Sequence, residues 1–343
     1  MFEKIVKDGD EFRRSYVQGF DAFIQRLNNE GYAQREAFMP IEGFAENIEK
    51  YRRAYHTMLG LDKIPAVTDG ESTMTKIGED EDAEIFRVTF PIVQEIPMQG
   101  LLFVPHGTEC APLIIAQHGG GGTPELCADM NGKNNYNHMV RRLLRRGAIV
   151  FAPQLLLWNQ KEPLPTQPVH AVPYDRAKCD IALKRFGMSI TALEIKGIMN
   201  AITVLSALPY VAEDKIGMIG ISYGGYFTLH TMAADTRIRA GFSNACFNDR
   251  NNYPWLDWTY KDSGNTFQDA EVAALCAPRK LYIAVGKDDA VFSYQGAVSE
   301  IERAKKYFDA CGCAESLRFL LWDGGHTLPN DDEGLDFLFS AFE

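Results

Sequence analysis

The chain has 343 residues, of which 46% are hydrophobic and 24% are charged, and these proportions exclude the disordered and fibrous classes. Its net charge is −11 at pH 7, so its surface repels phosphate backbones and we expect no nucleic-acid partner. The charged N-terminus does not resemble a signal peptide, and no apolar run reaches the roughly 18 residues of a membrane span. Seven scattered cysteines, an odd number, favour reduced thiols, and we expect a cytoplasmic protein with no membrane partner and no metal site.

Two amphipathic helices are expected at the start of the chain. In each, large apolar residues recur every three or four positions, which places them on one helical face. The two stripes are Phe12, Tyr16, Phe20, Phe23 and Leu27, then Ile41, Phe44, Ile48, Tyr51, Tyr55 and Met58. Such stripes are typical of core or subunit contacts, so the sequence is compatible with a homo-oligomer. We interpret residues 1–75 as an N-terminal helical segment that serves as a cap or an interface.

From residue 76 onward, short apolar runs alternate with helical patterns. Strands are expected over 85–90, 100–104, 113–116, 148–152, 215–221, 240–245, 280–285 and 317–321. Helices are expected over 136–146, 190–208, 224–234, 297–310 and 332–342. The alternation predicts one α/β catalytic domain over 76–343, with a mostly parallel central sheet covered by helices on both faces. In such sheets the ligand lies at the carboxyl ends of the strands, so the loops that follow strands hold the candidate site.

The loop after the expected strand 215–221 contains a candidate nucleophile. It has a G-x-S-x-G pattern between a strand and a helix, formed by Gly220, Ser222 and Gly224. A serine held out on such a tight turn brings the residues two before and two after it so close to neighbouring chain that little beyond glycine fits. The following helix directs its N-terminal N–H groups toward a developing oxyanion. We therefore predict that Ser222 is a catalytic nucleophile.

A serine hydroxyl needs a base, and histidine is the usual one. In this type of fold the chain order is serine, acid, histidine, and only His230 and His326 follow Ser222. His230 lies two turns down the same helix, which leaves His326, in a glycine-rich loop after the last strand. The acid that orients it is expected in the loop after strand 280–285, where Asp288 and Asp289 are both candidates.

Two backbone N–H groups are needed to stabilise the oxyanion. One is expected from Tyr223, which follows the nucleophile. The other is expected from the loop after strand 113–116, where four consecutive glycines begin at Gly119 and let the backbone approach a substrate oxygen. Gly120 is the preferred donor, with Gly119 next. A phosphate-binding loop is disfavoured, because Thr123 and Pro124 interrupt the run before any helix and no G-K-[ST] ending follows.

These motifs together resemble an α/β-hydrolase-fold serine hydrolase over about residues 83–343. Within that superfamily the chain is similar to the dienelactone-hydrolase and acetyl-xylan-esterase-like group, in the segments 115–120, 215–225, 277–281, 286–289 and 325–326. In that group the acid stands three residues after the glycine, which implies Asp289, and the residue after His-Gly supplies the oxyanion N–H, which implies Gly120. The stretch 222–226 also resembles the prolyl-oligopeptidase group of serine peptidases, whose large N-terminal β-propeller has no counterpart in these helical first 75 residues.

The expected function is therefore a serine hydrolase that cleaves small-molecule carboxylic esters through an acyl-enzyme, with no cofactor. A serine peptidase of the prolyl-oligopeptidase-like group that cleaves small peptides is the alternative. The aromatic segment 247–260 is a candidate pocket wall, in which Trp255 or Trp258 stacks on a sugar or an aromatic acyl group. A rigid lid is a candidate role for the loop that contains Pro163, Pro165, Pro168 and Pro173.

Overall fold

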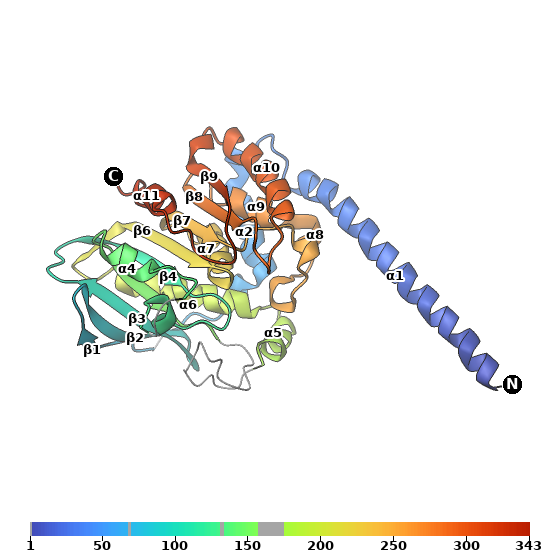
Figure 1. Ribbon diagram of the computed structural model, residues 1–343, viewed down its shortest axis with the longest axis horizontal. Coiled ribbons are helices and arrows are strands. Elements are labelled where there is room, and N and C mark those ends of the chain that lie inside the picture. The colour runs from blue at the N-terminus through green and yellow to red at the C-terminus, as the bar shows by residue number, and fades with distance from the viewer. Residues whose placement is uncertain (1, 68–69, 131–133, 157–174) are drawn as a thin grey trace.

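A computed structural model describes residues 2–67, 70–130, 134–156 and 175–343 (Figure 1). Pro163, Pro165, Pro168 and Pro173, the candidate lid residues, lie outside these ranges. The described strands are β1 (Thr73–Glu79), β2 (Ala83–Val93), β3 (Ile96–Pro105), β4 (Ala111–Gln117), β5 (Ile149–Pro153), β6 (Val211–Ile221), β7 (Ile238–Asn244), β8 (Lys280–Gly286) and β9 (Leu317–Trp322).

Helices surround these strands in the described ranges. They are α1 (Phe2–Phe38), α2 (Phe44–Leu59), α3 (Pro124–Cys127), α4 (Met139–Leu144), α5 (Arg176–Lys184), α6 (Ile190–Leu205), α7 (Tyr223–Ala234), α8 (Ser263–Thr266), α9 (Asp269–Ala274), α10 (Tyr294–Ala310) and α11 (Glu333–Phe339). Short 3₁₀ turns cover Leu61–Lys63, Arg250–Asn252, Leu256–Trp258 and Ala314–Ser316. No described helix is both long and apolar enough to cross a bilayer.

The strands form one sheet in the order β1-β2-β3-β5-β4-β6-β7-β8-β9 within the described residues. The β1–β2, β2–β3 and β3–β5 pairs are antiparallel, and all pairs from β5–β4 to β8–β9 are parallel. The predicted mostly parallel sheet is therefore confirmed. Strand β1 was not expected, because every residue of this edge strand is exposed and it lacks the apolar run that marks a buried strand.

Alternate residues of the central strands belong to two separate cores, one on each face of the sheet. In β4, Leu113 and Ile115 join the core that includes α2, α6 and α10, whereas Ile114 and Ala116 join the core that includes α4 and α11. Because successive strand side chains point to opposite faces, a strand covered on both faces is a continuous apolar run. This explains why the sequence predicted β4 and β8 closely.

The two N-terminal aromatic stripes have different environments. Phe44, Tyr51 and Tyr55 of α2 are buried in the same core as the sheet. The stripe of α1 is not part of the core of this chain, because Phe12 and Tyr16 are each 78% exposed. Figure 1 shows α1 extending away from the rest of the molecule, with the N-terminus at its far end. The proposed segment boundary at residue 75 stays a prediction.

The C-terminal end of α1 is held to the body by buried polar contacts. Arg35 is fully buried, where its Nε lies 3.3 Å from Glu271 and its guanidinium donates to the carbonyl of Gly264 at 2.6 Å. Nearby, the hydroxyl of Tyr32 donates to Asp249 at 2.5 Å. A buried carboxylate such as Glu271 needs its cationic partners, because it has lost its hydration.

Replacement of Arg35 by methionine is expected to lower the free energy of unfolding by about 3 kcal/mol, because Glu271 loses one of its buried cations. The matched control is Arg26→Met on the same helix, which breaks the exposed Arg26–Glu30 pair and is expected to cost less than about 1 kcal/mol. Urea unfolding followed by circular dichroism measures both values. Equal losses for the two variants would contradict the role assigned to Arg35.

Candidate active site

The predicted site residues follow strands whose carboxyl ends lie side by side. In the sheet register Gln117 is opposite Gly220, Ile221 is opposite Asn244, and Gly286 is opposite Trp322. The loops after β4, β6, β8 and β9 therefore begin side by side at the carboxyl ends of the parallel strands. These loops contain the four-glycine run, Ser222, the two candidate aspartates and His326, respectively. This is the edge at which parallel sheets hold their ligands.

Ser222 occupies a strained turn between β6 and α7. Its φ of 58° and ψ of −122° lie outside the regions that L-residues ordinarily adopt. The expected steric demand on the flanking glycines is confirmed: a Cβ on Gly220 would lie 2.3 Å from a backbone atom of Gly224. A Cβ on Gly224 would lie 2.1 Å from the carbonyl of Gln117. The turn lifts a partly exposed Ser222 above the sheet at the N-terminus of α7.

Asp289 is the aspartate that contacts His326. Its Oδ2 lies 2.8 Å from Nδ1 of His326, whereas Asp288 is exposed. The other oxygen of Asp289 accepts hydrogen bonds from the N–H groups of Val291 and Phe292. Because an ionised carboxylate only accepts hydrogen bonds, we assign the proton of neutral His326 to Nδ1, which leaves Nε2 as a proton acceptor.

The environment of Asp289 keeps it ionised. Burial by itself would raise the pKa of this carboxyl, but the hydrogen bonds from His326, Phe292 and Val291 outweigh burial and hold the pKa below its ordinary value. The side chain is fully buried, while that of His326 remains 22% exposed. A buried, ionised carboxylate next to a partly open imidazole can orient the ring and stabilise its protonated form.

Asn244 links the serine turn to the histidine loop. Its carbonyl accepts the backbone N–H of Ser222 at 2.9 Å, and its side-chain amide donates to the carbonyl of Thr327 at 3.0 Å. Asn135 binds the same loop through the carbonyl of His326 at 3.3 Å. The single residue Asn244 is therefore hydrogen-bonded to both loops, although 104 positions of sequence separate Ser222 from His326.

The two glycines proposed as oxyanion donors differ in their contacts. The N–H of Gly119 donates to the hydroxyl of buried Tyr136 at 2.9 Å, so this group is already occupied. Gly120 is exposed, and its N–H has no hydrogen-bond partner among the described residues. This difference favours Gly120 as the donor, while its catalytic role stays a prediction.

His118 holds the glycine loop in place and is neutral. Its Nε2 accepts hydrogen bonds from the backbone N–H of Leu155 at 3.0 Å and from the side-chain amide of Gln154 at 3.1 Å. A nitrogen that accepts cannot carry a proton, so Nδ1 is protonated and donates to the carbonyl of Gly119 at 2.8 Å. Burial lowers the pKa of His118 to about 4, which keeps this arrangement at neutral pH.

A buried charged cluster supports Tyr223 and was not predicted from the sequence. Arg176 donates to both oxygens of Glu194, at 2.9 and 2.7 Å, and to Asp257 at 2.7 Å. The hydroxyl of Tyr223 donates to the same carboxylate of Asp257 at 3.2 Å. These residues come from α5, α6, the 3₁₀ turn 256–258 and α7, so no local motif connects them. The one signal in the sequence is a glutamate among the mainly apolar residues at the start of the expected helix 190–208.

The two tryptophans proposed to contact substrate lie in different environments. Trp258 is 5% exposed and stacks on Tyr226, with ring centroids 4.4 Å apart and an interplanar angle of 4°, so it packs within the core. Trp255 is half-buried and stacks on Tyr223, with centroids 5.7 Å apart. Only Trp255 therefore retains an accessible surface next to the serine turn.

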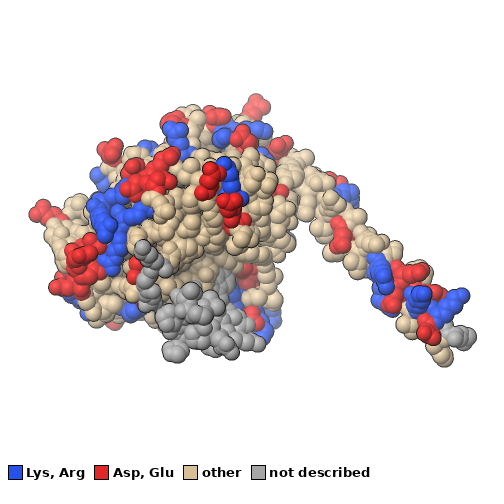
Figure 2. All heavy atoms as spheres, viewed as in Figure 1, with Lys and Arg blue, Asp and Glu red and all other residues tan. Residues whose placement is uncertain are grey.

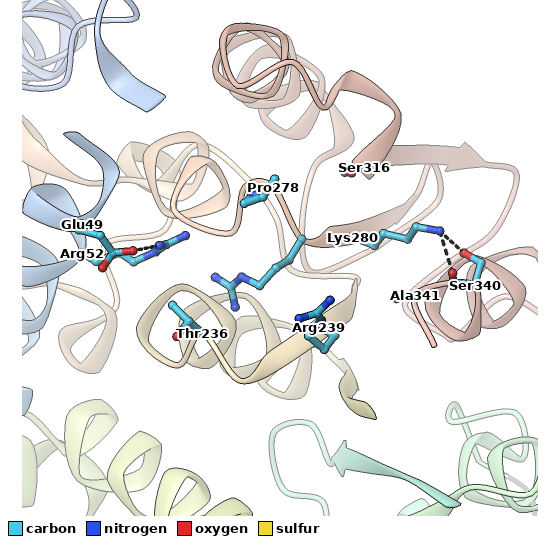
Figure 3. Close-up of a pocket in the computed structure, with 10 residues that line it drawn as sticks. Glu49, Arg52, Thr236, Arg239, Pro278, Lys280, Ser316, Ser340 and Ala341 are labelled. Atoms are coloured by element: carbon cyan, nitrogen blue, oxygen red, sulfur yellow. Dashed lines mark hydrogen bonds and ion pairs between the residues drawn. The ribbon is translucent and has the colours of Figure 1, made fainter. Parts of the chain in front are cut away.

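A basic cavity lies at the opposite edge of the sheet. It has a volume of about 530 Å³, and Lys280 and Arg239, near the amino ends of β8 and β7, line it (Figure 3). Arg52 and Arg279 also line it, but they donate to backbone carbonyls such as those of Leu275, Ala277 and Ile238. These cations stabilise local structure. A second hollow, of about 860 Å³ between α2 and residues 259–267, also lacks the candidate catalytic residues among its lining.

No group of three or more His, Cys, Asp or Glu in the described ranges is placed to hold a metal ion.

Comparison with known proteins supports the fold. Residues 192–290 match the model of the prolyl oligopeptidase family, a segment that includes Ser222 and Asp289. No curated protein matches the chain by sequence.

Several solved structures are similar to this chain. A methylesterase has a TM-score of 0.66 and 16% identity, covering 94% of this chain and 68% of its own. Acetyl xylan esterase 1 from Thermoanaerobacterium sp. has a TM-score of 0.60 and 14% identity, covering 87% and 94%. A glucuronoyl esterase from Solibacter usitatus has a TM-score of 0.59 and 17% identity, covering 85% and 92%. The chain thus has the α/β-hydrolase fold, and the predicted resemblance to acetyl-xylan-esterase-like proteins is confirmed at the level of the fold.

The low pKa of His118 predicts a specific loss of stability in acid. Between about pH 6.5 and pH 4 the unfolded chain binds a proton at this residue and the folded chain does not, so the free energy of unfolding falls as the pH falls through that window. The expected contribution is about 3 kcal/mol. His118→Gln removes the titrating group. Between pH 6.5 and pH 4 the free energy of unfolding should therefore fall by about 3 kcal/mol less in this variant than in the wild type. Parallel pH dependences in denaturant titrations would refute this assignment.

Proposed function

We propose that this protein is a serine hydrolase that cleaves small-molecule carboxylic esters through an acyl-enzyme. Ser222 is the nucleophile, His326 is the general base and acid, and Asp289 orients and stabilises the imidazole. The N–H groups of Tyr223 and Gly120 stabilise the oxyanion. All seven cysteines are free, which fits a reducing compartment such as the cytoplasm.

One observation carries the proposal. Oδ2 of Asp289 accepts the proton of Nδ1 of His326 at 2.8 Å, which leaves Nε2 as a proton acceptor. Asn244 joins the His326 loop to the strained Ser222 turn through hydrogen bonds to Thr327 and Ser222. Nucleophilic catalysis needs a base whose tautomer is set in this way and a serine presented on a tight turn, and here Asn244 joins the loops that carry the two.

The proposed reaction uses these residues in two half-reactions. Oγ of Ser222 attacks the carbonyl carbon while Nε2 of His326 takes the hydroxyl proton, and the carbonyl electron pair moves to oxygen. When the oxyanion collapses, the carbon–oxygen bond to the alcohol breaks, and His326 returns the proton to the departing alkoxide. Water then attacks the acyl-enzyme by the same sequence, which releases the acid and restores Ser222. Trp255 supplies an aromatic surface beside the serine turn on which an acyl or sugar group can stack.

A serine peptidase is the second candidate, and the match of residues 192–290 to the prolyl oligopeptidase family favours it. The esterase names of the similar structures favour the first. The two reactions share the nucleophile, the base and the oxyanion donors. They differ in the leaving group, an alcohol or an amine, so substrate preference separates them.

Replacement of the proposed catalytic residues should lower kcat by amounts that follow their roles. Ser222→Ala and His326→Ala are each expected to reduce kcat by about 10⁶, because the two residues act as a unit. Asp289→Asn should reduce it by about 10⁴, because the imidazole loses its orientation and its counter-charge. Asp288→Asn is the matched control, from an exposed neighbour, and should leave kcat nearly unchanged. If Asp288→Asn were the damaging change, the acid role would pass to Asp288.

A panel of acyl esters and peptide amides, assayed with the intact chain and with Ser222→Ala, tests the proposed substrate class. We expect turnover of short-chain esters by the wild type alone, and labelling of Ser222 by a fluorophosphonate. If the protein cleaved only the amides, the esterase proposal would be wrong and the serine peptidase would take its place. Absence of both turnover and labelling would show a binding protein without catalytic activity.

A further inference from the structure

The first 26 described residues of α1 form an arm that no other part of the described chain covers. Residues 11–27 are all exposed, and so are residues 2–8. The arm, residues 2–27, carries ten large apolar side chains that are at least 38% exposed: Phe2, Ile5, Val6, Phe12, Tyr16, Val17, Phe20, Phe23, Ile24 and Leu27. Soluble monomers rarely expose a contiguous apolar patch of more than a few hundred Å².

The apolar residues of the arm follow the spacing of a helix–helix contact. At 100° per residue all ten fall within an arc of about 140°, and they run along about 38 Å of helix. Within this arc, steps of four and three residues define a continuous seam: Phe2, Val6, Gly9, Arg13, Tyr16, Phe20, Phe23 and Leu27. This 4–3 alternation is the heptad pattern by which one helix packs against another.

The charges on the arm are balanced, in contrast to the rest of the chain. It carries five acidic and five basic side chains, namely Glu3, Asp8, Asp10, Glu11 and Asp21 against Lys4, Lys7, Arg13, Arg14 and Arg26. The arm is therefore neutral, whereas the whole chain has a net charge of −11. Figure 2 shows both signs interspersed near the tip of the arm. Two copies of this helix can lie together without the repulsion that the acidic body would produce.

We propose that two copies of this chain pair through their arms, with the seam of one α1 packed on the seam of the other. The exposed aromatic rings of two arms present on the order of 1,300 Å² even before the aliphatic residues are counted, which is within the range that specific interfaces bury. The seam contains one charged residue, Arg13, which pairs with Asp10 of its own helix at 2.5 Å. A polar residue at one seam position sets the register of such pairs.

The base of the arm is fixed, so that its apolar face has a set direction. A Cβ on Gly31 would lie 2.7 Å from the carbonyl of Gly264, and Arg35 and Tyr32 form the buried contacts described above. The balanced polar face also distinguishes the arm from helices that lie on membranes, which are rich in Lys and Arg. An anionic lipid surface would in addition repel a chain of net charge −11.

Sedimentation of the full chain at micromolar concentration tests the pairing. The wild type should have the mass of two chains, and the variant with Tyr16→Glu and Phe20→Glu should have half that mass, because four carboxylates would enter the paired seam. The control variant, Lys4→Gln with Lys7→Gln, changes the net charge by the same two units on the polar face and should keep the mass of two chains. Because these residues do not touch the body, the unfolding transition of its core should be retained in both variants.

Two results would overturn the proposal. One is a wild-type mass of a single chain, and the other is a glutamate variant that keeps the mass of two chains. In the first case, co-sedimentation with vesicles of phosphatidylcholine and phosphatidylserine distinguishes a helix that binds lipid from one that binds another partner.

Discussion

The close approach of three backbone segments around Ser222 is the constraint on which the candidate site depends. Gly220 and Gly224 leave no space for a Cβ, at 2.3 and 2.1 Å from neighbouring backbone atoms, and the serine between them is held at a positive φ. A backbone this crowded cannot relax into an ordinary helix start or strand end. The packed ends of β4, β6 and β7 therefore maintain the turn, and the serine stays at the carboxyl edge of the sheet.

Buried polar groups organise the region around that turn. His118 stays neutral because its Nε2 accepts two hydrogen bonds, and its Nδ1 in turn holds the carbonyl of Gly119. Arg176 joins two buried carboxylates beneath Tyr223. In a low-dielectric interior such groups are stable only when their partners are present, so each of them restricts the segments that it joins.

Sequence patterns predicted the parts of the fold in which local periodicity and burial coincide. Strand β8 was expected over 280–285 and spans Lys280–Gly286, because both of its faces are buried and its apolar run is continuous. Strand β1 was missed because an exposed edge strand has no such run. Trp255 or Trp258 was expected at a pocket wall, and the ring of Trp258 is covered by Tyr226, a residue 32 positions earlier in the chain. Composition cannot show which aromatic residues of a segment turn inward.

The amino-acid sequence alone determined the strand–turn–helix around Ser222, the order of serine, aspartate and histidine along the chain, and the end of the parallel strands from which their loops start. These features depend on steric limits and side-chain periodicity over a few residues, and such limits act before distant segments come together. Only the tertiary structure decided which of two adjacent aspartates contacts His326, that His118 is neutral, and that the aromatic face of α1 is bare. Each of these depends on which distant segments exclude water from a side chain, and the sequence does not specify those contacts locally.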